Sequence, residues 1–181
     1  MRIETERLLI RDLDPTDEDD LRRIVRQKNV VRFMRDWSDL CDRPGRLRDY
    51  IAWHQTQKDS TDVRVNKRYA IALKARPDAM IGMVGMGMED TLREVEMAYF
   101  LDEAFQGCGY ATEAVIALFD WCMAVSDLPY MILTIDCANA SSARVAERSG
   151  FELFERRYPM GHQQPNMESS CYDYYRKYRQ H

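Results

Sequence analysis

The segment with the clearest capacity for chemistry is Phe105-Gln-Gly-Cys-Gly-Tyr-Ala-Thr112, in which two glycines lead into a stretch with helical spacing. Glycines let backbone N–H groups converge, and a helix N-terminus adds partial positive charge. Such a loop can hold a pyrophosphate without any lysine or arginine. The same glycines could also serve only the geometry of a tight strand-to-helix turn. The segment alone leaves both interpretations open.

The segments around this loop alternate as strand, helix and strand. Residues 94–101 are β-prone, and residues 112–126 carry apolar side chains at the spacing of one helix face. Residues 130–137 form a nearly continuous apolar run, as expected for a strand buried on both faces of a sheet. This order predicts a right-handed crossover between two parallel strands, with the glycine loop between the first strand and the helix.

The rest of the chain predicts a sheet that continues on both sides of this pair. Apolar spacing, turn residues and glycines divide it into short strands and helices, without an internal repeat or a linker. The expected elements are a strand in 5–11, helices around Leu21 and around Ile51, a hairpin of 68–74 and 80–88 with a break at 75–79, a helix from Ser142 to Gly150, and strands at 151–158 and 171–178.

Length and composition predict one domain, residues 1–181, because 45% hydrophobic content is enough to bury a core. The amino-terminal residues carry charge where a secretory signal needs an apolar stretch, and no apolar run reaches membrane-spanning length. The net charge of −4 argues against a nucleic-acid binder, which needs a basic surface. We therefore expect a cytoplasmic protein with no nucleic-acid or membrane partner.

The cysteines indicate neither a disulfide framework nor a metal site. Their count of 5 is odd, no CxxC pair occurs, and no histidines stand nearby at metal-ligand spacing. A reducing cytoplasm fits this usage best.

With the loop set between a strand and a helix, the sequence resembles the GNAT superfamily of N-acetyltransferases. The acetyl-CoA loop of that family has the form Gln/Arg-x-x-Gly-x-Gly/Ala, matched here by Gln106, Gly109 and Ala111. The opening Glu4-Thr-Glu-Arg-Leu-Leu-Ile-Arg11 and the stretch from Asn139 to Phe151 are similar to the RimJ/RimL-like branch, which acetylates ribosomal-protein N-termini. Residues 41–62 and those after Phe151 match weakly.

The resemblance implies an α/β (α+β) fold: a central mixed, mostly antiparallel twisted sheet, one parallel strand pair splayed around the cofactor, and helices on both faces. It implies acetyl-CoA as co-substrate, no metal, and direct attack by a primary amine, either a protein N-terminal α-amine or a small-molecule amine. The residues expected at the cofactor are Tyr99, Phe100, Leu101, Gln106, Gly107, Cys108, Gly109, Tyr110, Ala111, Thr112 and Asn139.

Glu96 is the candidate for handling the amine proton. A carboxylate in a central strand is costly unless it is paired, hydrated or used, and the related branch often has a glutamate at this point. Glu96 could accept the proton directly, accept it through a water, or hold the ammonium form of the substrate. A surface-facing or ion-paired glutamate is the structural alternative. Glu94, on the same strand face, is the reserve candidate.

The thioester end of the reaction needs a polarised carbonyl and a proton for the thiolate. The resemblance implies a backbone N–H near Tyr99 to Leu101 for the carbonyl, with Asn139 and Ser142 facing the cofactor across the gap. Ser142 is the candidate proton donor, although it could instead be a helix N-cap. Many GNAT enzymes use a tyrosine four residues before the helix-ending glycine, where this chain has Ala146.

Ala146 keeps a second hypothesis open, an acetyl-CoA-binding regulatory protein without turnover. The resemblance places the acceptor pocket between the early helices and the loop at about 157–170, where this sequence matches least. It also makes a homodimer reasonable, with the late strands or their loop as the contact. Arg144 and Arg148 could approach the cofactor phosphates, and solvated helix charges are the plainer interpretation.

Overall fold

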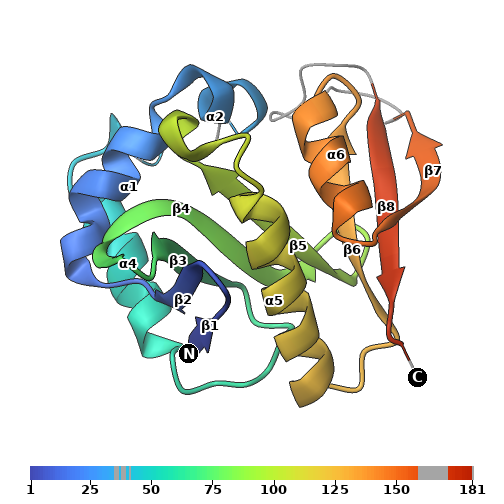
Figure 1. Ribbon diagram of the computed structural model, residues 1–181, viewed down its shortest axis with the longest axis horizontal. Coiled ribbons are helices and arrows are strands. Elements are labelled where there is room, and N and C mark those ends of the chain that lie inside the picture. Colours follow the sequence, from blue (N-terminus) through green and yellow to red (C-terminus); the bar gives the residue numbers. More distant parts are fainter. Residues whose placement is uncertain (35–36, 38–39, 41, 159–170, 181) are drawn as a thin grey trace.

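The computed structural model describes residues 1–34, 37, 40, 42–158 and 171–180. They form one eight-stranded sheet in the order β1-β2-β3-β4-β5-β6-β8-β7, with helices packed around it (Figure 1). The strands are β1 Arg2–Glu4, β2 Leu8–Asp12, β3 Lys67–Leu73, β4 Arg76–Glu89, β5 Glu94–Leu101, β6 Tyr130–Asp136, β7 Glu152–Arg157 and β8 Tyr172–Tyr178.

All neighbouring strands are antiparallel except β5 and β6, which are parallel. The predicted fold, a mostly antiparallel sheet with one parallel pair, is confirmed. The β3–β4 hairpin is tighter than expected, because β4 resumes at Arg76 and only Lys74 and Ala75 separate the two strands.

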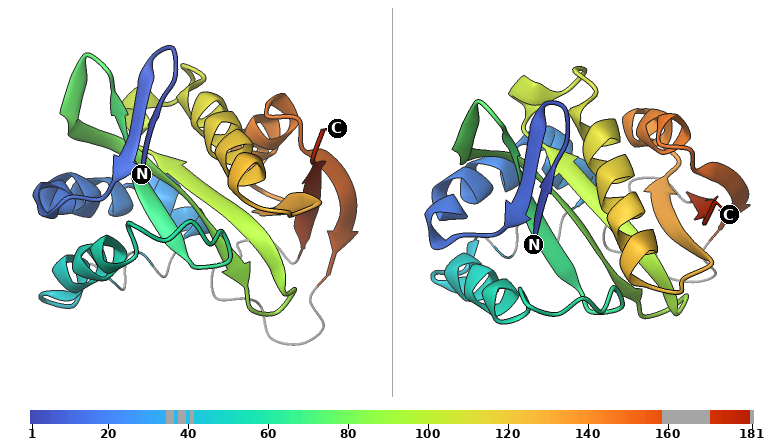
Figure 2. Two further views of the ribbon diagram at one scale, coloured as in Figure 1. Left: turned by 90° about the horizontal axis from the view of Figure 1, so that it is seen from below. Right: turned by 60° about the horizontal axis from the view of Figure 1, so that its bottom comes forward.

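Helices cover both faces of the sheet (Figure 2). One apolar core joins α1 and α4 to side chains such as Met83 and Phe100. The other joins α5 to side chains such as Val84 and Met97, which alternate with the first set along the same strands. The helices are α1 Glu18–Val25, α2 Lys28–Phe33, α4 Arg46–Thr56, α5 Tyr110–Val125 and α6 Ala140–Arg148, with short 3₁₀ turns at Pro15–Asp17 and Glu103–Phe105.

Among the described residues of the early helical region, α2 was not predicted; it follows α1 with only Arg26 and Gln27 between them. Sequence spacing shows α1 clearly, because its apolar stripe sits between an acidic first turn and a basic last turn. The six residues of α2 bury only Val30, and so leave little apolar periodicity to detect.

In the C-terminal part, the last strand, β8, inserts between β6 and β7. The helix α6 ends at Arg148, and Gly150 follows with φ 81°, a left-handed conformation that glycine adopts at little cost. The predicted stop at Gly150 is confirmed.

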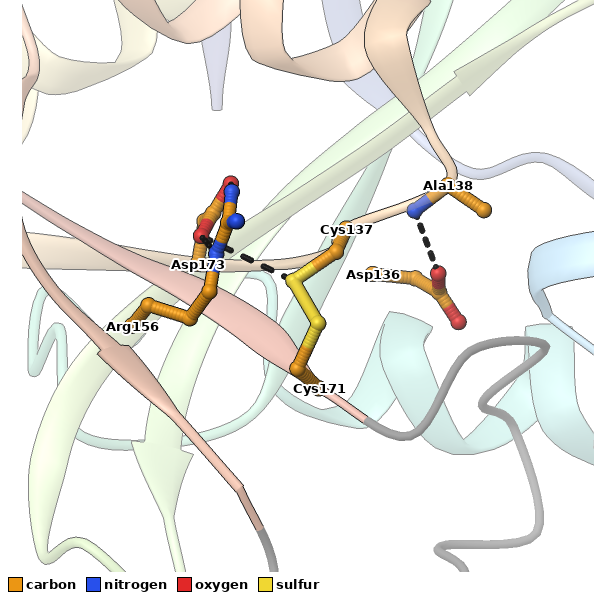
Figure 3. Close-up of a disulfide and its surroundings, with 6 residues drawn as sticks. All are labelled: Asp136, Cys137, Ala138, Arg156, Cys171 and Asp173. Carbon is orange, nitrogen blue, oxygen red and sulfur yellow. Dashed lines mark hydrogen bonds and ion pairs between the residues drawn. A yellow bond between two sulfur atoms is a disulfide. The ribbon is translucent and has the colours of Figure 1, made fainter.

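The expectation of no disulfide is wrong, because Cys137 is bonded to Cys171 (Figure 3). The last β6–β8 register pair is Asp136 with Tyr172, so Cys137, which follows β6, lies opposite Cys171, which precedes β8. The two Cα atoms lie 5.8 Å apart, within the normal range for a disulfide. This pairing depends on β8 lying beside β6, which cysteine spacing does not reveal. Cys41 lies outside the described residues.

Candidate active site

The parallel strands β5 and β6 open a cleft in the middle of the sheet. Their only register pair is Glu96 with Ile132, while β5 stays paired with β4 as far as Leu101. Two cavities of about 330 Å³ each adjoin at this opening. Both are lined by Phe33, Met34, Tyr99, Asn139 and Ser142.

One cavity collects the predicted cofactor residues. Of that set, every residue but Cys108 lines it. Cys108 is exposed at the loop, with its thiol 3.6 Å from the Gln106 carbonyl oxygen. The cavity therefore runs from the edge of β5 to the glycine loop and the start of α5.

The glycine loop turns sharply into α5. Gly107 and Gly109 have φ of 77° and 82°, and Gly109 is the N-cap of the helix. The Gln106 side-chain amide donates to the Leu101 carbonyl oxygen at 3.1 Å, so this side chain closes the loop on β5. Tyr110, Ala111 and Thr112 of the first helical turn line this cavity, and the backbone N–H groups of a first turn have no intrahelical partner. They provide an anion-binding geometry at one end of the cleft.

The other cavity is lined by Glu96 from β5 and Thr134 from β6. The Thr134 backbone N–H donates to Glu96 Oε1 at 3.2 Å, and the Thr134 hydroxyl donates to the same oxygen. Burial raises the Glu96 pKa above its ordinary 4.5, outweighing these two hydrogen bonds, which act to lower it. A carboxylate in this state is a stronger base than an exposed glutamate.

Glu94, two residues earlier, is held in a different setting. Its carboxylate accepts hydrogen bonds from the hydroxyls of Tyr130 at 2.6 Å and Tyr174 at 2.5 Å. It also pairs with Arg176 at 3.1 Å. Burial acts to raise its pKa, but these partners outweigh burial and leave the pKa below its ordinary value. Glu94 ties β5, β6 and β8 together and does not line either cavity.

Asn139 and Ser142 lie where the cavities meet, and Asn139 begins α6. Its Oδ1 accepts from the Ser142 backbone N–H at 3.2 Å and from the Ser141 hydroxyl at 2.8 Å. The N-cap is therefore Asn139, and the alternative interpretation of Ser142 as the N-cap is wrong. Ser142 lines both cavities.

The Tyr99 side chain has a role that the sequence did not indicate. Its hydroxyl donates to the Ser142 carbonyl oxygen at 3.0 Å and so joins β5 to α6 across the cleft. Burial raises the pKa of this phenol, which keeps it protonated. Only the position of Tyr99 near the end of β5 could have suggested this contact with α6, the helix that follows the neighbouring parallel strand β6.

The sequence pattern of the acetyltransferase (GNAT) domain family matches residues 7–152. The chain belongs to the GNAT acetyltransferase family. It is therefore an acyltransferase.

Solved structures of acetyltransferases share its fold. RimL, a ribosomal L7/L12 alpha-N-protein acetyltransferase in complex with coenzyme A, is 19% identical, with a TM-score of 0.78 and 98% of each chain covered. An acetyltransferase from Agrobacterium tumefaciens is 24% identical, with a TM-score of 0.70 over 99% of this chain and 95% of that one. The microcin C7 self immunity acetyltransferase MccE, with acetyl-CoA and AMP, is 15% identical, with a TM-score of 0.73 over 96% and 93%. Among curated proteins, no sequence matches the chain.

This GNAT chain departs from the usual general acid at Ala146, which is fully buried against the α5 side of the sheet. Of three tyrosines in β8, Tyr172 lines the cavity that contains Glu96, whereas Tyr174 and Tyr175 are buried. Arg144 and Arg148 are exposed on α6 and also line the cavity of the glycine loop.

Within the described residues, no group of three or more metal-ligating side chains could hold an ion, and no helix is long and apolar enough to cross a membrane. Most of the predicted acceptor loop, residues 159–170, lies outside the described residues.

Proposed function

We propose that this acyltransferase moves an acetyl group from acetyl-CoA to a primary amine by direct attack of the amine. One observation carries the proposal: two adjoining cavities place the first turn of α5 at one end of the cleft and the carboxylate of Glu96, whose pKa burial raises, at the other. The thioester would lie between them, along the edge that β5 exposes where it parts from β6.

The loop cavity suits the phosphates of acetyl-CoA. Backbone N–H groups at the start of α5 and the conformation of Gly107 and Gly109 fit a pyrophosphate. Arg144 and Arg148 add two exposed cations to the same cavity. RimL and MccE are solved with coenzyme A and acetyl-CoA, which supports the same ligand here. Acetyl-CoA supplies the acetyl group, and the protein supplies its position.

Glu96 would handle the proton of the amine, which arrives as an ammonium. Its carboxylate would accept this proton directly or through a water, or hold the ammonium in place before attack. A backbone N–H of residues 99–101 would polarise the thioester carbonyl. Ser142, at the junction of the cavities, would donate a proton to the departing thiolate. This donor need not be strong, because a thiol with a pKa of about 8.5 leaves readily.

The acceptor is either a protein N-terminal α-amine or a small amine. RimL acts on the α-amine of a ribosomal protein, and this chain is similar to the RimJ/RimL-like branch in its opening and in α6. We propose a cytoplasmic location and a homodimer as the working assembly, and one domain over residues 1–181.

The test is acetyl-CoA consumption, followed by thiol release, against polyamines, amino sugars and peptides with varied N-terminal residues. Amine-dependent release is expected and would name the acceptor class. Tight binding of acetyl-CoA with no release from any amine would favour the regulatory, non-catalytic alternative.

A further inference from the structure

The turn of the amino-terminal hairpin β1–β2 lies beside the start of α5 (Figure 2). From this turn, Arg7 reaches the glycine loop about a hundred residues later in the sequence. Its Nη1 donates to the Cys108 carbonyl oxygen at 2.9 Å, and its Nε donates to Glu113 Oε2 at 2.7 Å. The guanidinium also lies 4.5 Å from the centre of the Tyr110 ring. One side chain thus contacts the loop, the first residue of α5 and its first turn.

Glu113 has two opposing effects at the start of α5. An acid in the first turn stabilises a helix, but here it also puts a negative charge beside the proposed phosphate site. Burial acts to raise its pKa, and hydrogen bonds from Thr5 and Arg7 outweigh burial and lower it, so it is ionised near neutral pH. Its carboxylate accepts from the Thr5 hydroxyl and from the Arg7 backbone N–H at 2.9 Å as well as from the guanidinium.

The Arg7 guanidinium is suited to contact the glycine loop and Glu113 together. Its planar fork donates in fixed directions, so it can hold the loop carbonyl and the carboxylate at once. By donating to the Cys108 carbonyl oxygen it occupies this acceptor and holds the loop beside the hairpin. By pairing with Glu113 it cancels the one acid in the first turn of α5.

We propose that Arg7 is a positioning residue for acetyl-CoA: it fixes the glycine loop and neutralises Glu113, so that the start of α5 presents only donors to the phosphates. This inference rests on the proposed function, because it assumes that the loop binds acetyl-CoA. It assigns to the amino-terminal hairpin a part in cofactor recognition.

The experiment compares two acetyl donors, acetyl-CoA and S-acetylpantetheine, which lacks the phosphates. Arg7→Gln should lower kcat/KM for acetyl-CoA about tenfold and leave kcat/KM for S-acetylpantetheine within about twofold. The matched control is Arg2→Gln on the same hairpin, since Arg2 forms an exposed ion pair with Glu4 at 2.8 Å and does not touch the loop. Arg2→Gln should leave kcat/KM unchanged for both donors.

The double variant Arg7→Gln/Glu113→Gln tests the electrostatic part. Because it removes the uncompensated acid, it should bind CoA more tightly in calorimetry than Arg7→Gln alone. If Arg7→Gln fails to fold, Arg7→Lys takes its place, since lysine keeps the ion pair but cannot hold both partners in the fixed fork.

Provided that the wild-type enzyme binds CoA, two results would overturn the role of Arg7. One is an equal loss of kcat/KM with both donors in Arg7→Gln, and the other is an unchanged CoA affinity in that variant. Double-variant affinity no better than that of Arg7→Gln would overturn the neutralisation of Glu113. A wild-type protein that binds no CoA would instead overturn the proposed function, and this inference with it.

Discussion

Glu94 and Glu96 lie two residues apart on the same face of β5, yet the protein treats them in opposite ways. Glu94 meets two phenols and an arginine, and its pKa falls. Among the described residues, Glu96 accepts hydrogen bonds from Thr134 of the neighbouring strand alone, and burial raises its pKa. The difference comes from the strand partners: β6 and β8 supply partners to the first carboxylate, and the parting of β5 from β6 leaves the second in the cleft. The surroundings of each carboxylate thus give Glu94 a structural role and leave Glu96 able to accept a proton.

Glu96→Gln should lower kcat about a hundredfold or more, because the proton acceptor is lost. In the wild type, kcat/KM should fall as the pH drops through the Glu96 pKa, which desolvation of the half-buried carboxyl raises above 4.5. The variant should lack this acidic limb. A pH profile of thiol release from pH 5 to 9 measures both effects.

Stability supplies the control for this variant. A carboxyl whose folded-state pKa is raised stabilises the fold only while protonated, and this contribution is lost as the pH rises through the folded-state pKa. Glu96→Gln should therefore be at least as stable as the wild type at pH 8, while Glu94→Gln should melt at a lower temperature. An unchanged pH profile in Glu96→Gln would assign the base to another group.

At the scale of elements, two helices begin in the same way and differ in what lies next to them. Gly45 precedes α4 with φ 80° and Gly109 precedes α5 with φ 82°. A Cβ at Gly45 would meet nothing within 4 Å, and one at Gly109 would meet only Arg7 Nη2, at 3.4 Å. The backbone cost of replacing either glycine is therefore comparable, about 1–2 kcal/mol for the left-handed conformation.

Gly109→Ala should raise the Kd for acetyl-CoA about tenfold, because the added methyl narrows the approach of the phosphates to the backbone. Gly45→Ala should lose similar stability without a change in Kd, since Gly45 lines neither cavity. Calorimetric titration of both variants makes the comparison. Equal Kd values for acetyl-CoA in the two variants would show that the glycine loop does not bind the cofactor.

The elements differ in how far sequence could predict them. The strand at 94–101 has the predicted bounds, since its β-prone residues end where Asp102 caps a 3₁₀ turn. The start of α6 was predicted two residues late, because Asn139, Ser141 and Ser142 are all N-cap types and only the backbone selects among them. The contact of Arg7 with the glycine loop has no local signal, because it joins residues about a hundred positions apart.

At the scale of the whole molecule, the strand order decides features that neither residues nor elements show alone. The insertion of β8 beside β6 places Glu94 near Tyr174 and Arg176, and it places Cys137 opposite Cys171. The disulfide therefore fastens β8 at the residue before the strand begins. Two residues that line the Glu96 cavity, Asp136 and Tyr172, lie directly next to its cysteines.

Cys171→Ala should lower the free energy of unfolding, because the disulfide closes a loop with a sequence separation of 34. The loop-entropy relation gives a loss of about 3–4 kcal/mol for a closure of this length. Urea titrations with and without a reductant measure it. The wild type should lose this stability on reduction, and Cys171→Ala should be insensitive to the reductant. A wild type that is equally stable in both conditions would mean that the two thiols stay unpaired in solution, as the cysteine pattern predicts for a reducing cytoplasm.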